Sequence, residues 1–299
     1  MRKFLLAVVL LVAGPALAST WPNKPVKIVI PYAAGGTSDI VARTIQPTLS
    51  KLLNQNVIIE NVPGANGTIG ASRVSQTRDN HTFLLTADEI VPNSVAEPTA
   101  DHSMTNFRGV SFMAHSPVVL AVGMTSSYAT TADLLKSPTV TFGNGGTRSA
   151  AFFTVSAARP GWTSVPYKGG GQMWPDVIAG HVQASAASAL QTNVHAQANK
   201  VRPMLVFAPK RIATMPNVPT SYEMGIPVSG SVWIGILAPK QTSTEAVDAF
   251  AKALNSALLD PENNSKLTER GLIIDVKGPA EFDRYLNESL TTVKKNFRE

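Results

Sequence analysis

Short apolar runs alternate with segments of helical periodicity at the start of the chain. The runs Val26–Ile30, Val57–Glu60 and Thr82–Thr86 are rich in β-branched and large apolar residues, which is typical of buried strands. A helix is predicted between the first two, and a second, from about Thr68 to Thr77, precedes the third. The order strand, helix, strand, helix, strand predicts parallel strands joined by crossover helices and therefore an α/β fold. The apolar face of the first helix is Ile40, Val41, Ile45, Leu49 and Leu52.

The same alternation continues through the middle of the chain, and helices dominate its last part. The predicted helices are Thr131–Lys136, one that ends near Ile178, one that begins at Thr244, one between Asp260 and Gly271, and one from Pro279. The predicted strands are Pro117–Met124, Thr139–Phe142, Trp162–Pro166, Val182–Ala186, Ser231–Leu237 and Leu272–Val276.

Pro47 breaks a local rule, because it falls inside the first predicted helix. A proline there removes the hydrogen bond to the carbonyl of residue 43 and costs about 3 kcal/mol if nothing compensates. We expect the helix to kink or to end early at this position.

A glycine-rich turn joins the first strand to the first helix. Pro31 ends the strand, Gly35 and Gly36 form the turn, Thr37 or Ser38 is a good helix N-cap, and Asp39 suits the positive end of the helix dipole. Residues 143–153, GNGGTRSAAFF, repeat the pattern after a second strand, with Thr147 or Ser149 as the cap. The free N–H groups of a helix N-terminus behind glycines can bind a carboxylate or phosphate. Either turn could instead only connect a strand to a helix.

The first eighteen residues read as a secretory signal peptide. Arg2 and Lys3 precede an apolar stretch, and Ala16-Leu17-Ala18 is a small-x-small cleavage site, so cleavage is expected after Ala18. The chain has no cysteine, which excludes disulfides and a lipid-bearing cysteine, and we expect a freely diffusing periplasmic protein. The net charge of +6 includes the two basic residues of the leader, and the other basic residues are scattered. Nucleic-acid binding is therefore not expected.

Enzyme and metal signatures are missing from the sequence. No G-x-S-x-G, H-E-x-x-H or Walker sequence occurs, and the five histidines have no ligand spacing, so neither a metal site nor a cofactor is expected. His181 and His195 are interpreted as surface or capping residues, and Trp174 and Trp233 as packing residues.

Three acidic side chains beside the predicted turns have competing interpretations. Asp39 is interpreted as holding its own loop rather than as a general base. Asp88 and Glu89 could use a carboxylate for ligand specificity, but solvation at the surface is the preferred interpretation. A secreted hydrolase that uses the region of Asp39, Asp88 or His115 stays open as an alternative function.

Seven sequence blocks together resemble the solute-binding receptors of tripartite tricarboxylate transporters, the Bug-type periplasmic proteins. In order and spacing, the similarity covers essentially the chain from Trp21 to the last helix. The blocks are VKIVIPYAAGGTSDIVART, VIIENVPGANGTIGA, TFGNGGT, VPYKGGG, DVIAGHV, MPNVPTSYEMGIP and WIGILAP.

The resemblance implies a type II periplasmic binding protein fold, in which two Rossmann-like α/β lobes are joined by two crossing strands with a ligand cleft between them. The crossing strands are expected near Val119–Met124 and Ser231–Ile236. Lobe 1 would then comprise residues 19–122 and 231–299, and lobe 2 residues 123–230, after a signal peptide of residues 1–18. The implied function is capture of a small organic carboxylate, resembling a di- or tricarboxylate, for a membrane transporter. The protein is expected to act as a monomer, without a cofactor and not as an enzyme.

The resemblance also implies where the ligand binds. In the family the contacts come from the loops after the first strand of each lobe, the loop after the third strand, and the Tyr-Lys-Gly turn. The expected ligand-binding residues are Tyr32, Ala33, Ala34, Gly35, Gly36, Thr37, Ser38, Asp39, Thr86, Ala87, Asp88, Gly143, Asn144, Gly145, Gly146, Thr147, Arg148, Tyr167, Lys168, Gly169 and Ala187.

Two positions depart from the family pattern. Family members often have an aspartate where this chain has Ala187, which argues against an amino-acid ligand. Arg148 replaces a residue that is usually small, and it could either pair with a second carboxylate of the ligand or extend to the surface. A sensor role, and another anion such as phosphate or a sugar acid as the ligand, stay open as alternatives.

Overall fold

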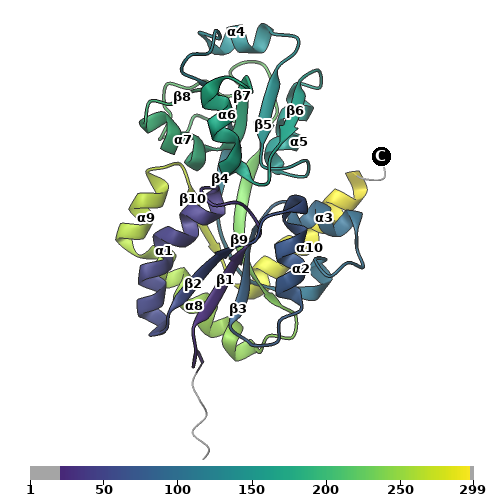
Figure 1. Ribbon diagram of the computed structural model, residues 1–299, viewed down its shortest axis with the longest axis vertical. Helices are drawn as coiled ribbons and strands as arrows, with labels where there is room; N and C mark the ends of the chain where they lie inside the picture. Colours follow the sequence, from purple (N-terminus) through teal and green to yellow (C-terminus); the bar gives the residue numbers. More distant parts are fainter. Residues whose placement is uncertain (1–20, 297–299) are drawn as a thin grey trace, which may run out of the picture.

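The computed structural model describes residues 21–296, so the predicted signal peptide lies outside the described residues. The described part of the chain forms two lobes stacked along the long axis of the molecule (Figure 1). The lower lobe, lobe 1, contains both ends of the described chain, and the upper lobe, lobe 2, contains its middle. Mixed α/β lobes of this kind are what the sequence pattern predicts.

Lobe 1 is built on the strand order β2-β1-β3-β9-β4, with β10 paired to the free side of β4. The strands β1, β2 and β3 are parallel, whereas β9 runs antiparallel to both β3 and β4. Its elements are β1 (Val26–Ile30), α1 (Thr37–Leu53), β2 (Val57–Asn61), α2 (Thr68–Ser75), β3 (Thr82–Ala87), α3 (Ile90–Ala96), the first part of β4 (Phe107–Gly123), β9 (Ser231–Pro239), α8 (Thr244–Leu259), α9 (Pro261–Thr268), β10 (Ile273–Lys277) and α10 (Pro279–Asn296).

Lobe 2 is built on the second part of β4, which pairs with β7 and β8, while β7 continues to β5 and β6. The strands β5, β6 and β7 are parallel to one another. Its elements are α4 (Thr131–Lys136), β5 (Thr141–Asn144), α5 (Ala150–Ala158), β6 (Thr163–Pro166), α6 (Trp174–Ala179), β7 (Ala184–Ser188), α7 (Ala189–Gln197) and β8 (Val201–Val206).

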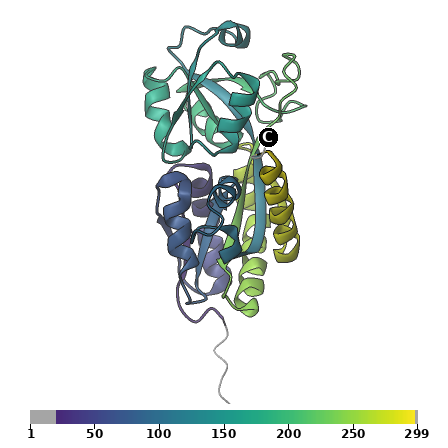
Figure 2. The ribbon, with the colours of Figure 1, turned by 90° about the vertical axis from the view of Figure 1, so that its right-hand side faces the viewer.

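Strand β4 connects the two lobes. Residues 107–117 pair with β9 in the lobe 1 sheet, and residues 118–123 pair with β7 and β8 in the lobe 2 sheet. The long strand passes through the narrow waist of the molecule beside β9 (Figures 1 and 2). Both crossing strands therefore fall where they are expected, although β4 begins ten residues before the predicted start at Pro117. The exact lobe boundaries stay a prediction.

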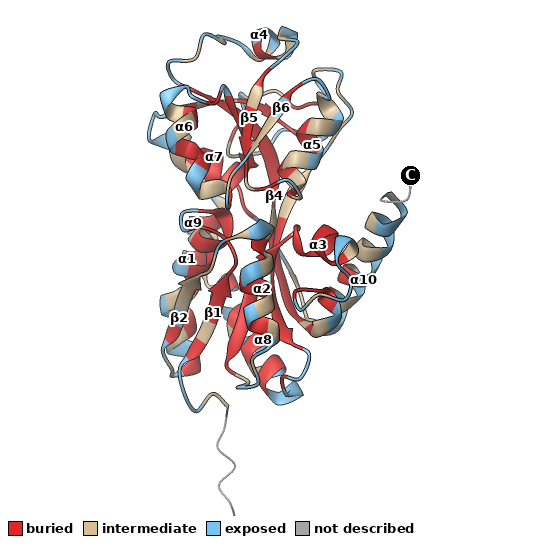
Figure 3. Cartoon of the chain, turned by 45° about the vertical axis from the view of Figure 1, so that its right-hand side comes forward, coloured by how far each residue is buried: buried red, intermediate tan, exposed pale blue. Residues whose placement is uncertain are grey.

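Each lobe has its own hydrophobic core. One lobe 1 cluster joins residues from both ends of the chain, such as Ile45 of α1 and Phe250 of α8, while α10 packs on the opposite face through Phe282. In lobe 2, Phe142 and Val155 belong to a separate cluster. Most strands are largely buried, except strands such as β6 and β10, and the helices expose their outer faces (Figure 3). Since each lobe buries its own core, the two can move relative to one another about the crossing strands.

Helix α1 continues through Pro47 to Leu53, so the expectation that it ends early at this proline is wrong. Pro47 lies on the exposed side of the helix, where water can satisfy the carbonyl of Arg43. Packing of the buried face, which includes Ile45 and Leu49, stabilises the helix on both sides of the proline.

Candidate functional site

The loop between β1 and α1 presents a helix N-terminus to lobe 2. The N-cap is Gly36, with an extended backbone and no side-chain cap, so the prediction that Thr37 or Ser38 is the N-cap is wrong. Gly35 has a φ of 78°, in the left-handed region that favours glycine. Among residues 21–296, no side chain caps the first N–H groups of this helix, and Gly36, Thr37 and Ser38 line the cleft.

Asp39 holds this loop together. Its Oδ2 accepts a hydrogen bond from the backbone N–H of Gly35 at 2.9 Å, and its Oδ1 accepts one from Arg43 Nε, also at 2.9 Å. Burial acts to raise the pKa of Asp39, but the hydrogen bonds from Arg43 and Gly35 outweigh it and leave the pKa below its ordinary value. The interpretation of Asp39 as a loop-holding residue is confirmed, and both carboxylate oxygens are engaged within lobe 1.

The corresponding loop of lobe 2 lies between β5 and α5. Ser149 is the N-cap of α5, and its hydroxyl accepts a hydrogen bond from Phe152 N at 3.1 Å. Asn144 shapes the loop, because its Oδ1 accepts from Gly146 N at 3.0 Å and its Nδ2 donates to Ser164 Oγ at 2.7 Å. Of the two predicted caps, Ser149 rather than Thr147 is the N-cap of α5.

The two lobes touch across the cleft. Thr37 Oγ1 of lobe 1 lies 2.7 Å from Ser188 Oγ of lobe 2. Ala33 N donates to the carbonyl of Lys168 at 3.2 Å. Gln191 Nε2 donates to the carbonyl of Gly35 at 3.3 Å. These contacts close the cleft around its two glycine-rich loops.

A cavity of about 50 Å³ remains between the closed lobes. By this measure a single water needs roughly 10–15 Å³, so the cavity has room for only a few water-sized groups. Of the predicted ligand-binding residues, those that line it are Tyr32, Gly36, Thr37, Ser38, Ala87, Gly145, Gly169 and Ala187.

The other predicted residues lie around this cavity rather than on its wall. Thr86 Oγ1 lies 3.3 Å from Tyr32 OH, and Tyr167 OH donates a hydrogen bond to Asp176. Asp88 and Arg148 face a neighbouring pocket. The residues that shape or flank the glycine-rich loops are Ala33, Ala34, Gly35, Asp39, Gly143, Asn144, Gly146, Thr147 and Lys168.

A third strand-to-helix junction at this site was not predicted from the sequence. Ser188 ends β7 and caps α7, where its hydroxyl accepts from Gln191 N at 3.2 Å, and both side chains line the cavity. The run ASAASALQTN contains no glycine, so it lacks the turn signal of the other two loops. A serine three residues before a glutamine, directly after a predicted strand, is the capping signal that could have found it. The other missed lining residues are Glu89, Ser149, Ala151, Gly170, Ala186 and Val232.

Glu89 is buried next to the cavity, so its interpretation as a solvated surface residue is wrong. Its Oε2 accepts a hydrogen bond from Tyr32 OH at 2.9 Å, and Tyr32 OH in turn accepts one from Ala87 N at 3.2 Å. Burial raises the pKa of Glu89 to about 7, against an ordinary value of 4.5. The side chain therefore changes charge near neutral pH.

Asp88 of lobe 1 contacts lobe 2, so its interpretation as a solvated surface residue is wrong as well. Its Oδ2 accepts a hydrogen bond from Ala150 N, the first residue of α5. Its Oδ1 is buried, and within residues 21–296 it has no hydrogen-bond partner. Burial, together with the charge of Glu89, raises the pKa of Asp88 well above its ordinary value. One of the chain's own carboxylates thus occupies the N-terminus of α5.

Arg148 also reaches across the cleft. Its Nη1 donates to Asn93 Oδ1 of α3 at 3.1 Å and lies 3.9 Å from Glu97 Oε1. The guanidinium is thus directed to lobe 1 and away from the small cavity. In this closed arrangement it makes an interlobe contact, and its pairing with a ligand stays a prediction.

The aromatic and histidine predictions hold in part. Trp174 and Trp233 are buried in separate hydrophobic clusters, so their packing role is confirmed, although Trp233 also lines a pocket. His181 is exposed beside Asp176, as expected for a surface residue. His195 instead packs against Trp174, with ring centroids 4.3 Å apart and the ring planes tilted by 32°. Among residues 21–296, no group of three potential metal ligands is found.

Comparison with known proteins gives consistent results. Residues 41–296 match the family described as Tripartite tricarboxylate transporter family receptor. The UPF0065 protein in the TAR-I ttuE-ttuC' intergenic region of Agrobacterium vitis is 32% identical over 285 residues, covering 89% of this chain and 81% of that protein. Protein BugT of Bordetella pertussis is 28% identical, covering 83% of this chain and 80% of its own length.

A solved structure extends the similarity to the fold. The structure of R. palustris Rpa4515 with adipate superimposes with a TM-score of 0.85 at 27% sequence identity, and the match covers 92% of this chain and 96% of that one. In residues 21–296, no helix is both long enough and apolar enough to span a bilayer. The sequence match over most of the chain and the shared two-lobe fold lead to one conclusion: the protein belongs to the family of tripartite tricarboxylate transporter receptors of the Bug type, which are periplasmic solute-binding proteins.

Proposed function

We propose that this protein captures a small organic carboxylate in the cleft between its lobes and delivers it to the membrane subunits of a tripartite transporter. The observation that carries the proposal is the uncapped N-terminus of α1, which faces lobe 2 across the closed cleft. The adipate in the Rpa4515 structure supports a carboxylate as the ligand class.

The proposed contacts are mainly backbone N–H groups. The loops of residues 32–39 and 143–148, the segment 86–88, the turn 167–169 and Ala187 would surround the ligand, with Ser188 and Gln191 added from the structure. A Kd of 1 μM corresponds to about 8 kcal/mol. Charge-assisted hydrogen bonds contribute about 1.5–3 kcal/mol each, so several of them suffice together with lobe closure.

Closure requires that the ligand touches both lobes, because a ligand shifts a conformational equilibrium only by its differential affinity for the two states. A dicarboxylate satisfies this condition with two acid groups.

Isothermal titration calorimetry and thermal unfolding, with protein refolded free of bound small molecules, test the proposal. Adipate, succinate, malate and citrate form the panel, and inorganic phosphate is the competing anion. At a hundred times Kd, a ligand adds about 2.7 kcal/mol to the free energy of unfolding. No response to any carboxylate in the panel would contradict the proposal. Binding of phosphate alone would keep the fold and change the ligand class.

The hydrolase alternative is weaker. Asp39 bonds to Gly35 and Arg43, Asp88 to Ala150, and His115 to Ser231, so the described hydrogen bonds join none of the three candidate residues to another. The family consists of receptors, which also favours binding over catalysis. Mass spectrometry of each acid after incubation with the protein would reveal turnover.

We further propose that the signal peptide is cleaved after Ala18, that the receptor is a monomer and that the lobe boundaries fall near residues 122 and 230. Intact mass of the exported protein and its sedimentation velocity test the first two. Limited proteolysis at the crossing segments tests the third.

A further inference from the structure

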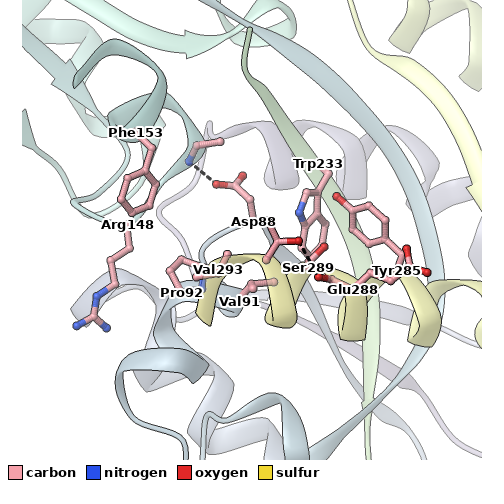
Figure 4. Close-up of a pocket in the computed structure, with 12 residues that line it drawn as sticks. Asp88, Val91, Pro92, Arg148, Phe153, Trp233, Tyr285, Glu288, Ser289 and Val293 are labelled. Atoms are coloured by element: carbon pink, nitrogen blue, oxygen red, sulfur yellow. Dashed lines mark hydrogen bonds between the residues drawn. The ribbon is translucent and has the colours of Figure 1, made fainter. Parts of the chain in front are cut away.

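A second, larger pocket lies on the α10 side of the molecule. It has a volume of about 620 Å³ and is formed by α5 of lobe 2 together with α3, β9 and α10 of lobe 1 (Figure 4). This volume falls within the range of about 300–1,000 Å³ that is typical of small-molecule sites. The pocket is therefore large enough for a complete organic ligand, which the closed carboxylate cavity is not.

The pocket is separate from the carboxylate cavity. Three pairs of neighbouring residues line opposite sides of one wall. Val232, Ala87 and Ala151 face the small cavity, whereas Trp233, Asp88 and Ala150 face the large pocket. The hydrogen bond from Ala150 N to the Asp88 carboxylate is part of this wall (Figure 4).

Most of the pocket surface is apolar. Phe153 comes from α5, while Trp233 and Tyr285 come from β9 and α10 on the other side of the opening (Figure 4). Val91, Pro92 and Val293 complete the apolar wall. Phe153 is 43% exposed, a large exposed fraction for a phenylalanine, because it borders this opening. An apolar body of the size of one aromatic ring would cover it.

The charged groups of the pocket favour a cation. Two of its lining residues, Asp88 and Glu288, are acidic. Arg148 is the basic lining residue, and its guanidinium is directed to Asn93 and Glu97. Asp88 lines the pocket, and its Oδ1, which lies just beneath the pocket surface, lacks a hydrogen-bond donor among the described residues. A small movement of the side chain toward the opening would let an ammonium group supply that donor. Aromatic faces such as those of Trp233 and Tyr285 also attract cations.

We propose that this pocket is a second ligand site and binds a primary amine with an aromatic or branched apolar body. The ammonium group donates to Asp88, and the body packs between Phe153 and Trp233. Because the pocket walls belong to both lobes, the amine favours the closed arrangement. This site is spatially separate from the carboxylate site, and the proposal stands whether or not the proposed function is correct.

Titration calorimetry with 2-phenylethylamine, with quenching of Trp233 fluorescence as a second readout, tests the proposal. The matched probes are 2-phenylethanol, which is neutral, and 3-phenylpropionate, which carries the opposite charge. We expect the amine to bind about tenfold or more tighter than the alcohol, since a hydrogen bond to a charged group contributes that much. We expect the acid not to bind in this pocket. Equal binding of all three probes, tighter binding of the acid, or no binding of the amine would overturn the proposal.

Three variants locate the binding site. Asp88→Asn should weaken amine binding about tenfold or more while leaving the alcohol unchanged. Ser289→Phe fills the pocket from α10 without changing charge and should abolish binding of the amine. Asp248→Asn, an exposed position on α8 outside the pocket, is the matched control and should change nothing. The thermal unfolding midpoint of Ser289→Phe shows whether it is folded. Undiminished amine binding in a folded Ser289→Phe variant would place the amine elsewhere and overturn the proposal.

Discussion

The two glycine-rich loops look alike in sequence but end in different surroundings. In lobe 1, α1 begins at Gly36 without a side-chain cap. In lobe 2, α5 begins with the hydroxyl cap of Ser149 and receives, in addition, the Asp88 carboxylate of the opposite lobe. The lobe 1 terminus is therefore available to an external anion, whereas the chain itself already provides an anion to the lobe 2 terminus.

A strand, a glycine turn and a helix therefore do not define an anion site by themselves. What decides is whether the first N–H groups of the helix already have an acceptor, and that depends on residues far away in the sequence. Asp88 lies sixty-two positions from Ala150. Five predictions test this asymmetry between the loops, four through ligand binding and one through stability, beginning with the contact on which closure depends.

The largest effect is expected from Gly171→Ala. A Cβ at Gly171 would overlap the carbonyl oxygen of Ala34 in the opposite lobe, so it blocks closure at the lobe 1 loop while leaving each lobe intact. Overpacking of this kind costs about 1–3 kcal/mol, and carboxylate affinity should fall about 10- to 100-fold. Calorimetry with adipate measures the affinity. Gly278→Ala, which would meet nothing within 4 Å, is the control and should bind normally. Normal binding by both variants would show that closure at Gly171 is not needed.

The next effect concerns pH. Because the pKa of Glu89 is raised to about 7, this side chain is largely neutral at pH 6.5 and charged at pH 8.5. A charged Glu89 repels an anionic ligand in the cavity that it lines. Affinity for adipate should therefore rise about tenfold between pH 8.5 and pH 6.5. In Glu89→Gln the affinity should depend less on pH, with any remaining dependence due to Asp88, whose pKa is also raised. An unchanged pH profile in that variant would exclude Glu89 as the cause.

The same group affects stability. Between its ordinary pKa of 4.5 and the raised value of about 7, the folded state binds more protons than the unfolded state. The contribution of Glu89 to the free energy of unfolding is thus full below pH 4.5, decreases as the pH rises to 7 and is level above. Urea unfolding as a function of pH should contain this contribution to the slope, and Glu89→Gln should remove that contribution while leaving those of other groups such as Asp88.

A smaller effect is expected for Asp88→Asn on carboxylate binding. Removing the charge that the chain places at the N-terminus of α5 leaves the amide oxygen as acceptor for Ala150 N, but it ends the repulsion of an incoming anion. Affinity for adipate should increase about fivefold, which corresponds to about 1 kcal/mol. The variant should also be more stable at pH 7, since a buried carboxyl with a raised pKa opposes folding when ionised. Weaker adipate binding would mean that the Asp88 charge supports the site.

The smallest effect is expected for Thr37→Val. It removes the hydroxyl that lies 2.7 Å from Ser188 Oγ across the cleft, a net loss of about 0.5–1.5 kcal/mol. Adipate affinity should fall several-fold, with a similar fall for Ser188→Ala. A double-mutant cycle isolates the contact. Additive losses in the double variant would show that the two hydroxyls do not act as a pair.

The sequence predicted the fold well wherever apolar periodicity was strong. Most strands and the long helices α1, α8 and α10 lie close to their predicted positions. The first ten residues of β4 were missed because small and polar residues interrupt the apolar run there. Ser111 and Ser116 are fully buried, and they are satisfied by Asn255 and by the carbonyl of Gly271, partners that only the folded chain brings near.

Of the candidate site, only the positions of the two glycine-rich loops could be predicted from the sequence. The glycines marked two junctions correctly, but the acceptor at each helix N-terminus depends on tertiary contacts, and so does the burial of Glu89. Charged residues in a predicted loop are usually solvated, so the sequence favoured the surface for Asp88 and Glu89. Arg148 could not be placed either, because its partner Asn93 lies in the short helix α3, which the sequence pattern did not reveal.

The route of β4 and β9 through both lobes also governs how this chain can be made. The sheet of lobe 1 is complete only when β9 is inserted between β3 and β4, and the partners of α1 lie on α8 and α9. A nascent chain emerging from the ribosome therefore cannot finish its first lobe until β9 has been synthesised, and β9 begins 205 residues after the start of β1. Delayed assembly of this kind, which depends on contacts distant in sequence, is slow. It leaves time for the polypeptide to be exported while still unfolded.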